Sequence, residues 1–260
     1  MLKTTTRRLA PFFATAWVVA AIALLGAVPL AAQEPPAPSP ATLVERSIEA
    51  VGGAEALAAV KTLKITGTTM INGIETPYEI VRQRPAMYRK TYFAESGPQI
   101  VATNGEVVWF QGRRRDGSQT PEAIEGDAAQ RLLEEEADFD GPLYGYADKG
   151  HTLEWVGDSE VDGTPAVHLR LTLASGRVQD WFLDRDEGYV LHKVTPQEHS
   201  RAGPYDRNWH FMEYEKVDGI AFPFYSEQED RQHVRSMTID SVEVNPEVDP
   251  TVFEMPSVSE

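Results

Sequence analysis

Six histidines are the side chains in this sequence best suited to hold a metal ion or to transfer a proton: His151, His168, His192, His199, His210 and His233. A zinc hydrolase spaces two histidines and a glutamate along one helix, because all three groups must face the same site. Glu198-His199 comes closest to such a motif, but position 195 is a threonine where the second histidine would stand. We therefore expect no metal site. A metal-assisted hydrolase that uses His192, His199 or His210 remains the enzymatic alternative.

Asp138 and Asp140 offer a second kind of chemistry, because two nearby carboxyl groups can act as acid and base. They lie in the segment DFDGPLYGY, whose glycines and proline are typical of turns, and aspartate is a common turn former. The glutamates at 134–136 are typical of a solvated helix end. Motifs for nucleophile elbows, phosphate loops and dinucleotide sites are absent. We expect neither a catalytic site nor a cofactor.

The charge balance limits the partners of this chain. It has 24 lysines and arginines against 40 acidic residues, a net charge of −16, which argues against nucleic-acid binding. The three arginines at 113–115 could bind lipid head groups or an acidic partner, although we favour a solvated hairpin tip. The sequence has no cysteine, which excludes disulfides and thiolate zinc sites.

The N-terminus has the composition of a targeting segment. Basic residues at positions 3, 7 and 8 precede an apolar run that ends in small residues at Ala31-Ala32. This pattern predicts a cleaved secretory signal peptide over residues 1–32, with an uncleaved membrane anchor as the alternative. Residues 33–41 are rich in proline and predict an extended linker.

The elements that must position any site are mainly strands. Thr42 is expected to cap a helix from Leu43 to Ala50, and Gly52-Gly53 separates it from a second helix over residues 54–60. From Leu63 onward, apolar and polar residues alternate along the chain, which predicts strands. We expect a hairpin at Asn104-Gly105, after one aromatic-rich strand, and a helix over residues 122–136.

A second series of strands begins near Thr152 and continues to Val244, with hairpin turns at Asp162-Gly163 and Asp218-Gly219. Together the two series predict about eleven strands. Hairpin succession favours a mainly β fold, a single curled antiparallel sheet or incomplete β-barrel, with helices covering the concave face. We predict one mature domain over residues 42–260.

Two motifs in this order resemble a known family. Arg84-Pro85-x-x-Tyr88 followed by Asn104-Gly105-x-x-x-Trp109-Phe110 resembles the LolA-like periplasmic carriers of lipoproteins, and the segment at 248–256 resembles their closing segment. Val51-Gly52-Gly53-Ala54 and the segment at 138–143 resemble a longer, largely uncharacterised branch of outer-membrane lipoprotein-sorting-like proteins. The likeness extends over the mature chain.

The resemblance implies a half-barrel with a helical lid over an apolar cavity that holds acyl chains. It also implies that the arginine before proline, here Arg84, bonds to the lid and helps to set its open and closed states. Arg82 lies two residues earlier and shares the face of Arg84 in a regular strand. If the resemblance holds, Arg84→Leu should fold but impair ligand release or transfer.

The expected function is a non-enzymatic carrier in the periplasm that binds a lipoprotein's acyl chains or another lipid. We expect a monomer that exchanges cargo with inner- and outer-membrane sorting components. An envelope-stress sensor with a similar half-barrel and a membrane partner is the alternative. Inward-facing aromatic residues can line a cavity or fill a core, and the sequence leaves both uses open. The expected ligand-binding residues are Arg84, Tyr78, Ile80, Tyr88, Trp109, Trp155 and Trp181.

Overall fold

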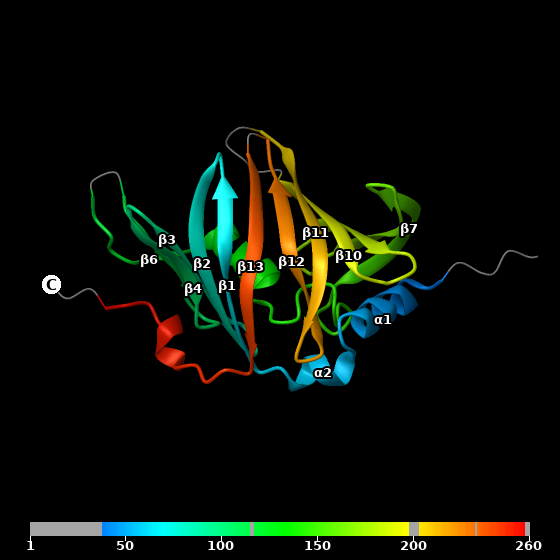
Figure 1. Cartoon of the computed structure of the whole chain (residues 1–260), viewed down its shortest axis with the longest axis horizontal. Coiled ribbons are helices and arrows are strands. Elements are labelled where there is room, and N and C mark those ends of the chain that lie inside the picture. Colours follow the sequence, from blue (N-terminus) through cyan, green and yellow to red (C-terminus); the bar gives the residue numbers. More distant parts are fainter. Residues whose placement is uncertain (1–37, 115–116, 198–202, 232, 258–260) are drawn as a thin grey trace, which may run out of the picture. The chain divides into compact units, whose positions relative to one another are not determined.

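The computed structural model describes residues 38–114, 117–197, 203–231 and 233–257. These residues form a thirteen-stranded antiparallel sheet in the order β6-β5-β4-β3-β2-β1-β13-β12-β11-β10-β9-β8-β7 (Figure 1). The N-terminal strands are β1 (Thr62–Ile71), β2 (Ile74–Gln83), β3 (Met87–Ala94), β4 (Gly97–Thr103), β5 (Val108–Gln111) and β6 (Glu122–Ile124). The C-terminal strands are β7 (Thr152–Val161), β8 (Thr164–Thr172), β9 (Val178–Asp184), β10 (Val190–Gln197), β11 (Tyr205–Val217), β12 (Ile220–Glu229) and β13 (Val234–Val244).

The predicted single antiparallel sheet is confirmed, but its strand number is thirteen rather than about eleven. The stretch expected to be one strand before Asn104 contains two, because a turn at residues 95–96 separates β3 from β4. Residues 122–124, expected to begin a helix, instead pair with β5 as the short strand β6. The helix starts later, at Gly126.

Hairpin turns have the conformations that their residues favour. Asp162-Gly163 and Asp218-Gly219 have positive φ at both positions, as does Asn72-Gly73. This backbone suits the twist of two-residue hairpins, and aspartate, asparagine and glycine tolerate it best. At Asn104 the loop is longer, and the Asn104 Oδ1 accepts hydrogen bonds from the backbone N–H groups of Glu106 and Val107.

Five short helical segments accompany the sheet in the described residues: α1 (Pro40–Ala50), α2 (Ala54–Ala59), α3 (Gly126–Leu132), a π-helical turn, η1 (Leu133–Ala137), that continues α3, and a 3₁₀ helix, η2 (Pro250–Phe253). The cap of α1 is Ser39 rather than Thr42, because the Ser39 hydroxyl accepts from the Thr42 N–H and proline occupies the first helical position. This helix therefore begins inside the predicted linker. The predicted signal peptide lies outside the described residues.

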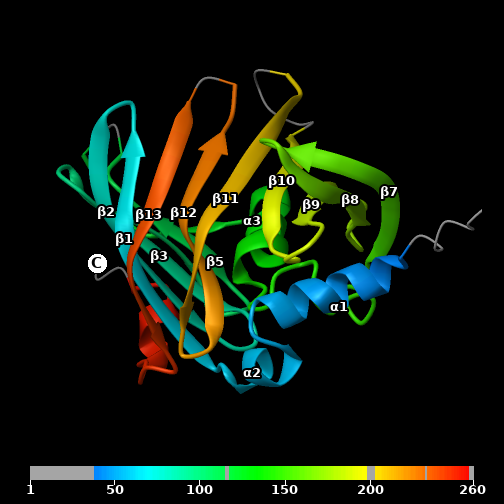
Figure 2. The same ribbon diagram turned by 45° about the vertical axis from the view of Figure 1, so that its right-hand side comes forward.

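The sheet curls around α3, whereas α1 and α2 lie across one end of it (Figure 2). Helix α1 buries Leu43 and Val44 against Leu169 and Leu183 of the C-terminal strands. A second core cluster joins Val60, after α2, to β1 and to the segment that follows η1. The helices thus cover part of the concave face.

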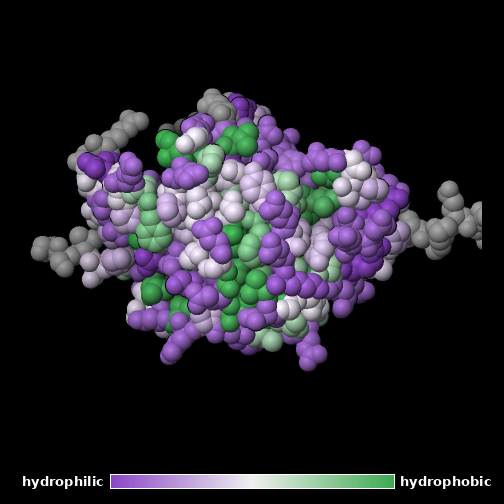
Figure 3. Space-filling view, in the orientation of Figure 1, coloured by the Kyte–Doolittle hydropathy of each residue, from purple (hydrophilic) through white to green (hydrophobic). Residues whose placement is uncertain are grey.

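The face turned toward the viewer in Figure 1 is mostly hydrophilic, and its hydrophobic residues form separate groups (Figure 3). This surface suits antiparallel strands that pack one side of the sheet and leave the other solvated. No helix within the described residues is long and apolar enough to cross a membrane.

Candidate functional site

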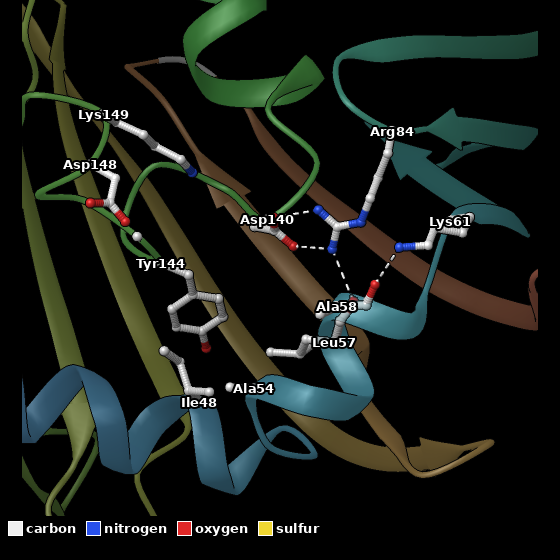
Figure 4. Close-up of a pocket in the computed structure, with 11 residues that line it drawn as sticks. Ile48, Ala54, Leu57, Ala58, Lys61, Arg84, Asp140, Tyr144, Asp148 and Lys149 are labelled. Carbon is white, nitrogen blue, oxygen red and sulfur yellow. Dashed lines mark hydrogen bonds and ion pairs between the residues drawn. The ribbon is translucent and has the colours of Figure 1, made fainter.

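Arg84 follows β2 and connects three parts of the chain (Figure 4). Its guanidinium group binds both carboxylate oxygens of Asp140 at 2.5 Å. The same side chain donates to the backbone carbonyls of Leu57, at 2.9 Å, and Val60, at 2.7 Å. These carbonyls lie at the end of α2, where the Leu57 carbonyl also accepts the Val60 N–H, so Arg84 caps the last turn of the helix. Arg84 therefore holds α2 to the segment that contains Asp140.

Arg82 holds the same segment from the neighbouring position on β2. It donates to the backbone carbonyls of Glu136, at 2.9 Å, and Asp138, at 2.6 Å. The guanidinium groups of Arg82 and Arg84 both lie over the buried Phe139 ring, at 5.3 Å and 4.4 Å from its centre. Burial lowers the pKa of Arg82. The two arginines together fix the start of the loop at residues 138–150, which we call the cover loop.

Other contacts fix the rest of the cover loop. Lys149 binds the Asp138 carboxylate at 2.6 Å and the Gly141 carbonyl at 2.7 Å. The Tyr144 hydroxyl lies 3.0 Å from the hydroxyl of Ser47, which is fully buried in α1. Burial raises the pKa of Tyr144, so this phenol stays neutral as a hydrogen-bonding group. The cover loop is thus attached both to the sheet and to α1.

Three cavities surround the cover loop, and Asp140 and Tyr144 line all of them. The largest, of about 550 Å³, lies beside α1 and α2 (Figure 4) and is lined by Ile48, Ala54, Leu57, Ala58, Lys61, Arg84, Asp140, Tyr144, Gly145, Asp148 and Lys149. A second, of about 160 Å³, includes Phe139, Leu63 and Phe222. The third, of about 310 Å³, includes Leu143, Trp181 and Phe211.

These cavities have apolar walls with a few charged groups at one side. Side chains of α1, α2 and the C-terminal strands supply hydrophobic surface, whereas Lys61, Asp148 and Lys149 lie at the rim of the largest cavity. Apolar pockets of this size with few polar groups are typical of ligand-binding sites. The arrangement can hold a flexible apolar chain without any reacting group.

Comparisons with known proteins identify the architecture. No family model matches the sequence, and no curated protein matches it. The structure is similar to a DUF1329 family protein from Desulfovibrio piger, with a TM-score of 0.58, 12% identity and coverage of 82% of this chain and 96% of that one. A LolA superfamily protein from Nitrosomonas europaea gives a TM-score of 0.55 at 12% identity, over 84% and 98%. The chain has a LolA-like fold.

A structure described as a "putative outer membrane lipoprotein-sorting protein domain", from Vibrio parahaemolyticus, shares this LolA-like fold, with a TM-score of 0.54, 10% identity and coverage of 83% of this chain and 97% of that one. The predicted resemblance to LolA-like proteins is therefore confirmed at the level of the fold.

The seven residues predicted to bind ligand are divided between the two faces of the LolA-like sheet. Arg84 lines the largest cavity and Trp181 lines the third. Three more lie on the concave face with Arg82. Tyr78 and Ile80 are two and one alternate positions before Arg82 on β2, and Tyr88 of β3 pairs with Arg82. Their role in binding remains a prediction.

Tyr78 and Tyr88 are almost completely buried, and each hydroxyl has a protein partner. The Tyr78 hydroxyl donates to the Thr238 carbonyl at 3.3 Å, and the Tyr88 hydroxyl donates to a Glu136 carboxylate oxygen at 3.4 Å. Trp155 packs against the core cluster that contains Leu169. These three side chains thus contribute to packing in this structure.

Trp109 differs from the prediction, because it lies on the opposite face of the sheet from Arg82. Trp109 pairs with Ala102, Ala102 pairs with Arg89, and Arg89 pairs with Val81 of β2. Val81 directly precedes Arg82, so Val81 and the residues paired with it point to the other face of the sheet. The indole N–H of Trp109 donates to the carbonyl of the fully buried Phe253 at 2.8 Å. Trp109 therefore packs beneath the C-terminal segment and not at the cavities around the cover loop.

Sequence reasoning interpreted Asp140 as a turn former and did not single out Tyr144 or Ser47. The spacing of Arg82 and Arg84 was one usable signal, since two arginines on one strand face require partners. The DFDG segment contains those partners, but only the fold brings it to the end of β2.

The histidines lie elsewhere. His192 and His210 are cross-strand neighbours whose rings stack at 4.3 Å, whereas His199 lies outside the described residues. Within the described part of the chain, no group of three or more histidine and acidic side chains could hold a metal ion.

Proposed function

We propose that this protein is a non-enzymatic carrier that binds the acyl chains of a lipid or lipoprotein in the periplasm. The observation that carries this proposal is the set of three cavities around Asp140 and Tyr144, closed by a cover loop that Arg84 holds in place. The LolA-like fold supports it, since one of the similar structures is described as a "putative outer membrane lipoprotein-sorting protein domain". Outer-membrane lipoprotein sorting is the role that we assign to this carriage.

The energetics of such binding need no catalytic or polar group. Each buried methylene contributes about 0.8 kcal/mol, so roughly ten methylenes contribute about 8 kcal/mol before the entropic cost of association. The cavities divide around the side chain of Tyr144. An acyl chain longer than one cavity would therefore need the cover loop to move.

Arg84 would then control release. Its bonds to Asp140, Leu57 and Val60 stabilise the closed, empty arrangement. A ligand that holds the cover loop outward competes with those bonds, and the closed arrangement in turn favours ligand release. A carrier needs this balance, because cargo that binds too tightly is not delivered.

The direct test is to purify the protein from the periplasm and to identify bound molecules by native mass spectrometry and lipid extraction. We expect co-purified lipid or acylated peptide, and saturable binding of a fluorescent acyl probe by the emptied protein. Leu57→Asp, which places a carboxylate in the wall of two cavities, should lower probe affinity at least about tenfold. Val156→Asp, on the exposed edge strand, is the matched control. Protein that is empty as purified and also fails to bind the probe would refute carriage.

A further inference from the structure

A polar cluster lies on the concave face of the C-terminal strands, next to the third cavity. Trp181, Lys193 and Trp209 occupy paired positions on β9, β10 and β11. Gln179, Thr195 and Arg207 are two residues further along the same strands, so they form the adjacent row on the same face. Glu135 of η1 has a buried Oε1 atom, and the charges that act on its carboxyl group are those of Lys193, Glu136, Arg131 and Arg207. We call Glu135, Gln179, Lys193, Thr195 and Arg207 the inner polar cluster.

Several atoms of this cluster have unfilled hydrogen-bonding capacity. The Gln179 Nε2, Thr195 Oγ1, Arg207 Nε and Glu135 Oε1 atoms are buried and have no hydrogen-bond partner among the described residues. Gln179 is 0% exposed and Thr195 is 2% exposed. A buried polar group without a partner costs about 1–3 kcal/mol, so four such atoms in one place point to a missing partner.

The amide of Gln179 is oriented by a neighbour. The Trp181 indole N–H donates to the Gln179 Oε1 at 3.1 Å, which leaves the Nε2 group as the free donor. Lys193 extends over the rings of Trp181 and Trp209, at 5.3 Å and 6.0 Å, and forms no ion pair within the described residues. Its ammonium group is therefore held by aromatic faces and keeps its capacity to donate.

The charge of the cluster selects an anion. Three positive charges, those of Lys193, Arg131 and Arg207, act at Glu135. The opposing groups are its own carboxyl group and that of Glu136, in a chain whose net charge is −16. Burial raises the pKa of Glu135, which favours its neutral form. Donors thus outnumber acceptors, and the arrangement suits a group with several acceptor oxygens.

We propose that the inner polar cluster binds the anionic head group, a phosphate or carboxylate, of the amphiphile whose acyl chain the protein carries. Trp181 connects the cavity for the acyl chain with the cluster for the head group, because it lines the third cavity and pairs with Lys193. The π-helical turn η1 supplies Glu135, and such turns occur frequently at functional sites. This inference rests on the proposed carriage of acyl chains.

The test compares decyl phosphate, 1-decanol and inorganic phosphate by isothermal titration calorimetry. We expect decyl phosphate to bind about tenfold or more tightly than decanol, as charge-assisted hydrogen bonds in a buried site provide. Equal affinity of decanol and decyl phosphate would overturn the head-group site and leave the carrier intact, as expected if ordered water fills the cluster. Failure of both to bind would refute the carrier as well.

Two variants distinguish the site from a structural role. Lys193→Met should remove the preference for decyl phosphate and leave decanol binding unchanged, whereas Lys216→Met, at an exposed position of β11, should change neither. Glu135→Gln should keep the preference for decyl phosphate, because an amide replaces a carboxyl group whose raised pKa already favours the neutral form. Thermal unfolding verifies that each variant is folded. An unchanged preference in Lys193→Met would overturn the proposal.

Inorganic phosphate provides the last comparison. If it binds as tightly as decyl phosphate and loses binding in Lys193→Met, the site belongs to free phosphate and the head-group assignment is wrong.

Discussion

Arg84 makes the side-chain bonds that join the cover loop to α2. It is the donor to two carbonyls at the end of α2 and to both oxygens of Asp140. Its side chain is 24% exposed and that of Asp140 is 34% exposed. The pair is sheltered from water, and its two parallel hydrogen bonds require a planar guanidinium rather than an ammonium group.

We expect Arg84→Leu to fold, to bind acyl probe more tightly and to release it more slowly, because the closed and empty arrangement loses its bonds. The free energy of unfolding should fall by about 1–3 kcal/mol. Stopped-flow release of the probe and chemical denaturation measure the two effects. Asp140→Asn should change release in the same direction, and the double variant should show less than the sum.

Arg89→Leu is the matched control. Arg89 lies on the other face of the sheet and donates to the Val252 carbonyl at 2.8 Å, so the variant should lose stability without slower release. Equal release rates in Arg84→Leu and the unchanged protein would remove Arg84 from the mechanism.

Tyr144 lines all three cavities around the cover loop. Tyr144→Ala should join the cavities and extend the longest acyl chain that binds with full affinity, at a cost of about 2–4 kcal/mol in stability. Tyr144→Phe keeps the ring and removes only the bond to Ser47, so its chain-length preference should not change. Affinities for a series of fatty alcohols measure the difference. An unaltered chain-length profile in Tyr144→Ala would show that the cavities do not hold the chain.

At the scale of elements, the C-terminal segment covers the outer face of the N-terminal strands. The short 3₁₀ helix η2 (Pro250–Phe253) buries Phe253 completely, and Arg89 and Trp109 donate to its backbone carbonyls. The segment acts as a strap for strands β3 and β5, on the face away from the cavities.

Trp109→Phe should therefore lower the free energy of unfolding and leave ligand binding unchanged. Loss of the bond to Phe253 and of part of the indole should cost about 1–3 kcal/mol. Denaturation and probe titration of the same preparation test both statements. A large loss of probe affinity in a stably folded variant would return Trp109 to the ligand site.

Four strands carry a ladder of stacked rings. His168, Phe182, His192 and His210 are cross-strand neighbours on β8 to β11, and their ring centres are 4.4, 5.1 and 4.3 Å apart. The pKa of His192 is lowered, chiefly by burial and next by the positive charge of His210, while Asn208 and Asp162 oppose the shift. The folded protein thus binds this proton less readily than the unfolded chain does.

Stability should consequently fall as the pH decreases through the unfolded pKa of about 6.5, and level off once the folded His192 is protonated. His192→Phe keeps a stacked ring and removes the titration, so its loss of stability between about pH 7.5 and about pH 5.5 should be smaller. Denaturant unfolding at each pH measures the slopes. Identical slopes would assign the acid sensitivity to other groups, such as His151, whose pKa burial also lowers.

At the scale of the molecule, the parts proposed to move are separate from the parts that hold the shape. The two series of strands meet where β1 pairs with β13 along nearly their whole lengths. Helix α1 is attached to this frame by packing against the C-terminal strands, and α2 and the cover loop are attached by the side-chain bonds of Arg84.

Ligand binding should therefore alter amide exchange in residues 40–60 and 126–150 and leave the central strands β1, β2 and β13 unchanged. Segments that open locally exchange with lower free energies than the sheet between them. Hydrogen–deuterium exchange with and without decanol measures this distribution. Changes confined to the C-terminal strap would place the ligand on the outer face.

The sequence by itself determined the antiparallel sheet, most hairpin turns and the break between the first two helices, because these features depend on alternation and on residues that tolerate positive φ. Through resemblance it also indicated Arg84 as a candidate functional residue, and that role remains a prediction. The separation of β3 from β4, the three-residue β6 and the cap at Ser39 were missed, since such boundaries depend on a few local bonds.

Only the tertiary structure decided what each side chain faces. Strand alternation places Tyr88 and Trp109 on definite sides, but which side becomes concave depends on how the whole sheet curls. Arg84 and Asp140 are 56 residues apart in the sequence, and their pairing requires the complete N-terminal series of strands. The inner polar cluster likewise combines η1 with three later strands, and no local pattern could have predicted it.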